Sequence, residues 1–188
     1  MRVLITFLLL IMGALGHSDQ GTHEEYVTNT GKVIRVIETH PIGLSLSNIR
    51  ITSQGFEHEF DEIFEDADPI KDVLVVDLDG NGYDEIYIIT VAAGSGSYGQ
   101  VIGAASNRDR SLSLISFPEI AAGDPVFQGY MGHDVFTVEK GRLVRAFPIY
   151  GATDSNAAPA GGTKKVFYAL SPGEAMWQLK IESVETVK

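Results

Sequence analysis

Two neighbouring segments carry the residues that could do chemistry. The first is Asp77-Leu78-Asp79-Gly80-Asn81-Gly82-Tyr83-Asp84-Glu85. Oxygen ligands at Asp77, Asp79, Asn81 and Glu85, with glycines for a tight turn, are what a calcium loop requires. The segment is not a full EF-hand, because Ile88 stands at the twelfth position, where a bidentate Glu belongs. The same residue types also make an ordinary turn between strands, so a calcium site and a metal-free turn both remain open.

The second segment, Ala92–Gln100, is rich in glycine and serine. Gly94, Gly96 and Gly99 match the dinucleotide-binding pattern G-x-G-x-x-G. That reading requires a following helix, whereas an apolar run at 101–105 and a polar turn follow here. Two interpretations are left. The segment is either a recognition loop with Tyr98 at its tip or a glycine-rich hairpin whose Tyr98 covers the core.

The sequence around these two segments predicts a series of short strands. β-branched and alternating apolar runs at 33–37, 44–51, 73–76, 85–91, 101–105, 111–117, 134–138, 143–150, 165–170 and 177–184 are separated by recurring turn signals. The slip in alternation at Asn48 predicts a bulge, and the run at 73–76 predicts a central strand. We expect a helical turn within the acidic segment 57–68 and a mobile loop at 153–163. The pattern predicts an all-β protein, an antiparallel β-sandwich or flattened barrel, in a single domain spanning 17–188.

The N-terminus and the composition indicate an exported protein. Residues 1–16 have the basic start, apolar run and small residues of a signal peptide, with cleavage expected after Gly16. The chain has no Cys, so we expect neither disulfides nor a lipid anchor, and stability must come from packing. With 14 basic and 25 acidic side chains and a net charge of −11, we expect no binding to nucleic acid or anionic membranes, and a preference for a cationic partner.

The stretch 40–120 resembles the periplasmic inhibitors of invertebrate-type lysozyme from Gram-negative bacteria. The resemblance is carried by Gly43-Leu44-Ser45-Leu46, by Asp77-Leu78-Asp79-Gly80-Asn81-Gly82 and by Ala93-Gly94-Ser95-Gly96-Ser97-Tyr98-Gly99. The Ser-Gly-x-Tyr element at 95–98 is also similar to that of inhibitors of chicken-type lysozymes. Those inhibitors are small and stapled by disulfides, unlike this chain.

The resemblance implies a β-sandwich, a homodimer and a periplasmic inhibitor of lysozyme. Lysozymes cleave peptidoglycan with two acidic side chains in a cleft. By resemblance, Ser95, Gly96, Ser97 and Tyr98 enter that cleft, with hydroxyls toward the carboxyls and the Tyr98 ring in a sugar position. The family also places a basic residue in a neighbouring loop. Arg110 is our choice for it, if the turn at 107–110 lies alongside the loop.

Two other function classes compete with inhibition. A calcium-binding extracellular module in adhesion or surface assembly would rest on the acidic turn. A hydrolase would have to use His40 or His133, and neither has a nucleophile or an acid–base partner at a definable spacing. His133 is expected in a turn or on the surface, and Trp177 in the core. We therefore expect a binding protein rather than an enzyme, with no cofactor unless calcium occupies the turn.

Overall fold

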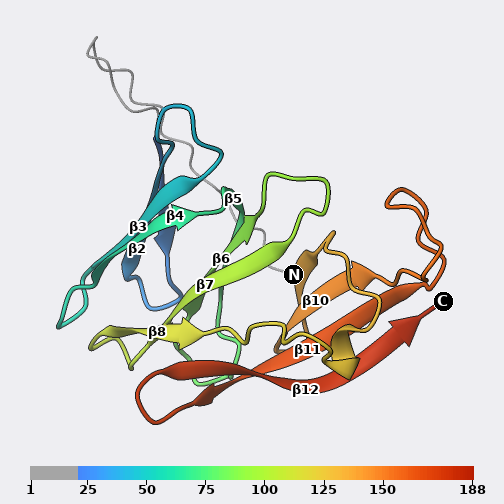
Figure 1. Cartoon of the computed structure of the whole chain (residues 1–188). Coiled ribbons are helices and arrows are strands. Elements are labelled where there is room, and N and C mark those ends of the chain that lie inside the picture. The colour runs from blue at the N-terminus through green and yellow to red at the C-terminus, as the bar shows by residue number, and fades with distance from the viewer. Residues whose placement is uncertain (1–20) are drawn as a thin grey trace.

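A computed structural model of the chain describes residues 21–188, which form two packed β-sheets (Figure 1). The second sheet curls upon itself as a half-barrel, and the first covers part of its outer face. The expected all-β sandwich or flattened barrel is therefore confirmed. The signal peptide expected at 1–16 lies outside the described residues. No helix in the described part of the chain has the length and hydropathy to cross a membrane.

The first sheet is an antiparallel meander of four strands in chain order: β1 (Thr22–Val27), β2 (Val33–Thr39), β3 (Ser47–Gln54) and β4 (Asp61–Ala67). Its pairing register shifts between Ser47 and Ile49, which confirms the bulge predicted at Asn48.

The second sheet has eight strands in the order β5-β6-β7-β8-β12-β11-β10-β9. All of its neighbours are antiparallel except β8 and β12, which run parallel through a short contact. A single 3₁₀ turn, η1, lies between β8 and β9. The bounds are β5 (Ile70–Val76), β6 (Glu85–Val91), β7 (Gly99–Ser106), β8 (Leu112–Ser116), η1 (Pro125–Phe127), β9 (Val135–Glu139), β10 (Arg142–Pro148), β11 (Thr163–Pro172) and β12 (Trp177–Val187).

Strand β6 separates two hydrophobic clusters. Tyr87 and Ile89 belong to the cluster inside the curl of the second sheet. Ile86 and Ile88 belong to the cluster between the two sheets, where they meet residues of β2 and β3. Both faces of β6 are thus buried, which explains its unbroken apolar sequence. The loops at its two ends are the two segments that the sequence singled out.

Three expectations about the strands need correction. The acidic segment 57–68 contains strand β4 instead of a helical turn, because its backbone pairs with β3. The apolar run at 73–76 lies in β5, at an end of the sheet rather than its centre. It is nonetheless apolar because Leu74 and Val76 pack on one cluster and Val73 and Val75 on the other. Strand β1, which the sequence analysis did not predict, is a largely exposed edge strand.

Candidate functional site

The Ser95–Tyr98 loop is the connection between β6 and β7, and its own backbone bonds shape it. The Ala92 amide donates to the Tyr98 carbonyl (2.9 Å), and the Ser97 amide donates to the Gly94 carbonyl (3.1 Å). Ser97 has a positive φ of 44°, and its hydroxyl also points back to the Gly94 carbonyl (3.3 Å). By contrast, the hydroxyls of Ser95 and Tyr98 have no hydrogen-bond partner among residues 21–188. The loop thus presents two free hydroxyls to solvent.

The Tyr98 ring lies across Gly96 and against Tyr130. A Cβ at Gly96 would come within 2.4 Å of the ring atom Cε2, so glycine is what permits this ring position. The ring meets that of Tyr130 edge-on, with 5.6 Å between centroids. Its side chain remains 47% exposed. Tyr98 is therefore held in place on one side and open on the other, and it does not serve to cover the core.

Two segments from elsewhere in the chain brace the loop. The His133 amide donates to the Gly96 carbonyl (2.6 Å), and the Asn156 side-chain amide donates to the Ser95 carbonyl (2.9 Å). His133 and Asn156 are themselves hydrogen-bonded, with 3.0 Å between Nε2 and Oδ1. A Cβ at Gly132 would lie 2.0 Å from the Gly96 carbonyl oxygen, so only glycine allows this approach. His133 has a positive φ of 58° and lies, partly buried, in the irregular segment before β9.

Beneath the loop, a buried ion pair holds Gly99, the first residue of β7. Asp134 accepts a hydrogen bond from the Gly99 amide (2.7 Å), while Nη2 of Arg145 donates to the Gly99 carbonyl (2.9 Å). Arg145 and Asp134 are joined by two bonds of 2.7 and 3.0 Å, and both side chains are buried. The Tyr130 hydroxyl donates to Asp134 (2.5 Å) and accepts from Arg145 (2.7 Å). The ion pair is thus linked through Tyr130 to the Tyr98 ring.

The surroundings keep Arg145 charged. Burial acts to lower the pKa of Arg145, but the hydrogen bond and charge of Asp134 outweigh it, so the pKa is raised overall. Four aromatic rings lie with their centroids 5.1–5.7 Å from the guanidinium carbon: Phe117, Phe127, Tyr130 and Phe136. Sequence reasoning missed this network. Its only signal was a single Arg within the apolar run 143–150.

Arg110 does not join the loop. It follows β7 at the end opposite to Gly99, so the eight residues of that strand, roughly 25 Å, separate it from Tyr98. Its side chain is exposed and pairs with Glu57 (3.0 Å). The turn at 107–110 was expected alongside the loop. The loop and the turn instead follow opposite ends of strand β7, so they lie at opposite ends of the hairpin. The expectation is therefore wrong.

The acidic turn joins β5 to β6 and brings three carboxylates together. One oxygen from each of Asp77, Asp79 and Glu85 lies within 4.8 Å of the others. Both oxygens of Asp77 accept backbone amides, from Asn81 (3.0 Å) and Gly82 (2.8 Å). The fourth candidate ligand, Asn81, uses its side-chain oxygen to accept the Tyr83 amide (2.8 Å). Burial, reinforced by the acidic neighbours, raises the pKa of Glu85 to about 8.

Two other candidates from the sequence have structural roles. His40 is hydrogen-bonded to the Ser47 hydroxyl (3.0 Å), but that hydroxyl is fully buried and donates to Glu38 (2.8 Å), so it is not open to a substrate. Trp177 packs against the cluster inside the curled sheet, as expected, and its indole N–H donates to Asn107 (3.1 Å).

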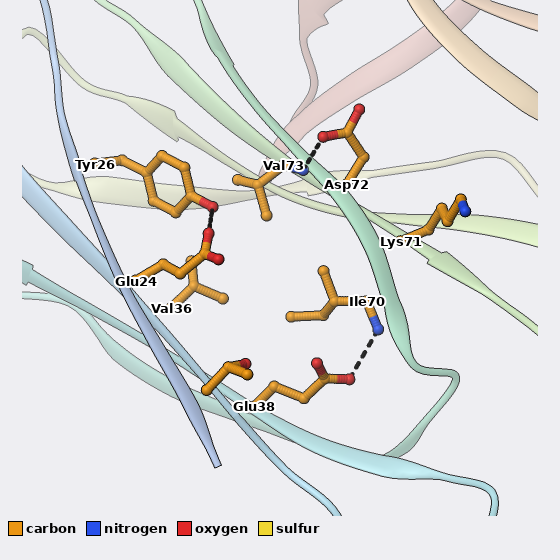
Figure 2. A pocket seen from close by; sticks show the side chains of 9 residues that line it. Glu24, Tyr26, Val36, Glu38, Ile70, Lys71, Asp72 and Val73 are labelled. Atoms are coloured by element: carbon orange, nitrogen blue, oxygen red, sulfur yellow. Dashed lines mark hydrogen bonds between the residues drawn. The ribbon is translucent and has the colours of Figure 1, made fainter. Parts of the chain in front are cut away.

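A cleft of about 280 Å³ lies between the edge strands β1 and β5. Figure 2 shows Glu24 and Tyr26 of β1 facing β5, and Glu38 of β2 reaching the backbone of Ile70. Glu38 is buried and accepts the Ile70 amide and the Ser47 hydroxyl, each at 2.8 Å. Within the cleft the Tyr26 hydroxyl donates to Glu24, and Glu38 joins the two sheets.

A second hollow, of about 620 Å³, is lined by residues 120–125, Phe127, Gln128 and Tyr130. It opens beside the ring that supports Tyr98. The Ser95–Tyr98 loop combines exposure, unpaired hydroxyls and bracing by distant segments. It is the candidate binding site. No family model, curated protein or solved structure matches this chain.

Proposed function

We propose that this protein is an inhibitor of lysozyme, of the invertebrate type, and that the Ser95–Tyr98 loop enters the active-site cleft of the enzyme. One observation carries the proposal. The backbone of the loop is held by His133 and Asn156, while Ser95 and Tyr98 are exposed and their hydroxyls are unpaired. The sequence of the loop matches the element on which the resemblance to lysozyme inhibitors rests.

The chemistry of the loop suits a cleft that holds two acidic side chains. The carboxyls of a glycosidase accept hydrogen bonds when ionised, and hydroxyls can donate them. Residues 92–99 contain no charged side chain, so the tip adds no carboxylate that the enzyme's own carboxylates would repel. Gly96 keeps the tip narrow, and the flat Tyr98 ring is suited to a sugar subsite.

Pre-organisation supports tight binding. Ordering a loop and its side chains on association costs about 0.5–1.5 kcal/mol for each immobilised side chain. Here the Tyr98 ring is already confined between Gly96 and Tyr130, and Gly96 is already bonded to His133. Little of the ordering cost therefore remains to be met when the loop binds.

The rest of the molecule favours encounter with a cationic partner. The net charge of −11 would steer such a partner toward the protein over the range allowed by salt screening. We place the protein in the periplasm, on the signal-like sequence at 1–16, where an inhibitor would protect the cell wall. As the resemblance implies, we also propose that it forms a homodimer.

The test is inhibition of peptidoglycan lysis by invertebrate-type, chicken-type and goose-type lysozymes. We expect the parent protein to inhibit the invertebrate-type enzyme selectively. Tyr98→Ala should weaken inhibition about 30-fold or more, equivalent to about 2 kcal/mol, because it removes the central aromatic anchor. Ser95→Ala should weaken inhibition by less, since it removes one hydroxyl.

Two matched variants serve as controls. Ser97→Ala deletes a hydroxyl that points back into the loop, and Arg110→Ala deletes an exposed charge at the far end of β7. Both should inhibit like the parent protein. Undiminished inhibition by Tyr98→Ala, or inhibition of none of the three enzymes by the parent, would overturn the proposal.

A further inference from the structure

The acidic turn between β5 and β6 contains a carboxylate oxygen that lacks a partner. The Glu85 side chain is fully buried. Its Oε2 accepts the backbone amide of Leu78 (2.8 Å), but its Oε1 is buried without a hydrogen bond. A buried carboxylate in this condition is costly unless a proton or a cation neutralises it. Within residues 21–188, no Lys, Arg or His forms an ion pair with Glu85.

The Glu85 carboxylate lies beside two further carboxylates. One oxygen of Glu85 lies within 4.8 Å of oxygens of both Asp77 and Asp79. Ligands on opposite sides of a calcium ion, each at 2.3–2.6 Å, are separated by about 4.6–5.2 Å. The three oxygens are thus close enough to share one ion. Asp77 and Asp79 are held in place by amides of the turn, and each oxygen keeps a second lone pair for a metal.

We propose that Asp77, Asp79 and Glu85 bind one divalent cation, and that this cation is calcium. All three donors are hard carboxylate oxygens, with no His or Cys among them, which favours calcium or magnesium over zinc or copper. Asp79 is exposed and Asp77 half-buried, so waters can complete the coordination shell. A partly open, irregular set of ligands suits calcium better than magnesium, which demands near-ideal octahedral geometry.

The role of the ion follows from what the turn contacts. Asp84, next to Glu85, accepts the backbone amide of Asn29 (2.6 Å), and the Asn29 side chain donates to the Gly82 carbonyl (3.1 Å). Asn29 lies between β1 and β2, so the turn is attached to the first sheet. An ion that fixes this turn would stabilise the junction of the two sheets. The Ser95–Tyr98 loop is at the other end of β6, so this inference is independent of lysozyme inhibition.

Thermal unfolding with and without calcium tests the proposal. The mature protein, stripped with EDTA and kept in 150 mM NaCl, should gain about 3–6 °C in Tm when calcium is added at saturating concentration. The gain should saturate and should be reversed by EGTA. Asp79→Asn should require at least ten times more calcium for the same gain. Glu85→Gln, a neutral variant of the same shape, should fold but show no calcium response.

A control and a direct probe complete the experiment. Glu65→Gln removes one negative charge from the exposed strand β4 and should respond to calcium like the parent. Terbium should bind the parent and emit on excitation of the nearby Tyr83 and Tyr87, and Glu85→Gln should abolish that emission. A parent Tm that millimolar calcium leaves unchanged would overturn the proposal, as would an equal calcium response in Glu85→Gln.

Discussion

Asp134 and Arg145 form a buried ion pair that is hydrogen-bonded to both backbone groups of one residue, Gly99. The carboxylate accepts the Gly99 amide and the guanidinium donates to its carbonyl. Gly99 begins β7, directly after Tyr98, and its Cβ position is filled by Phe136 and Asp134, at 2.7 and 2.9 Å. The ion pair therefore fixes the point at which the candidate recognition loop rejoins the sheet.

Removal of one partner of this pair should be strongly destabilising. Asp134→Ala would leave the Arg145 guanidinium buried without its counter-charge, and we expect a loss of about 3–5 kcal/mol in the free energy of unfolding. The double variant Asp134→Leu/Arg145→Met removes both charges. Its loss of unfolding free energy should be smaller than the sum of the losses in Asp134→Leu and Arg145→Met. Urea unfolding measures all of these values. Simple additivity would show that the two side chains are not coupled.

Gly96→Ala should impair inhibition without impairing folding. An added methyl would lie 2.4 Å from the Tyr98 ring, so the exposed ring must swing away from its position over Gly96. We expect a loss of inhibition of at least about tenfold, corresponding to about 1.4 kcal/mol, with Tm changed by no more than about 2 °C. Gly94→Ala is the matched control, because nothing lies within 4 Å of its Cβ position. Equal inhibition by both variants would contradict a role for the ring position.

The bracing of the loop by Asn156 predicts a modest effect on the rate of dissociation from the enzyme. Asn156→Ala removes the bond to the Ser95 carbonyl and the contact with His133. A neutral, partly exposed hydrogen bond contributes about 1 kcal/mol, so we expect dissociation from the enzyme to be a few times faster. Hydrogen exchange in 94–98 should accelerate in parallel. Ser155→Ala changes a neighbouring side chain and should behave like the parent, whereas unaltered exchange in Asn156→Ala would exclude a bracing role.

The parts of the fold that the sequence predicted are those with a local signal. Strand β6 was predicted with the bounds found in the structure, because turn residues flank its apolar run. The bulge at Asn48 was visible as a break in alternation. Strands β1 and β4 left no such signal, because edge strands with exposed side chains carry polar residues. Their pairing is with the next strand along the chain, β1 with β2 and β4 with β3.

The same distinction applies to the candidate site. The loop residues are contiguous, so Ser95 and Tyr98 could be recognised from their order alone. The groups that hold the loop come from 132–134, 145 and 156, which only the folded chain brings together. The expected position of Arg110, beside the loop, was wrong for the opposite reason. It is close in sequence, but a full strand of the hairpin separates it from the loop.

Glu38 offers a test of how the two sheets are held together. It is buried on β2 and accepts the Ile70 amide from β5 and the Ser47 hydroxyl from β3 (Figure 2). Glu38→Ala would leave the Ile70 amide unpaired and the Ser47 hydroxyl with His40 as its remaining partner, and should cost about 1–3 kcal/mol in urea unfolding. Glu38→Gln keeps an oxygen acceptor at the same place and should cost less.

The control for Glu38 is Glu24→Ala, because Glu24 is an exposed carboxylate on the same side of the cleft. It should change stability by no more than about 0.5 kcal/mol. Hydrogen exchange adds a local measurement, since the Ile70 amide should lose protection in Glu38→Ala and keep it in Glu24→Ala. If Glu38→Ala were as stable as the parent, the apolar cluster around Ile86 and Ile88 would suffice to join the sheets. The hydrogen bond across the cleft would then follow from sheet packing without contributing to it.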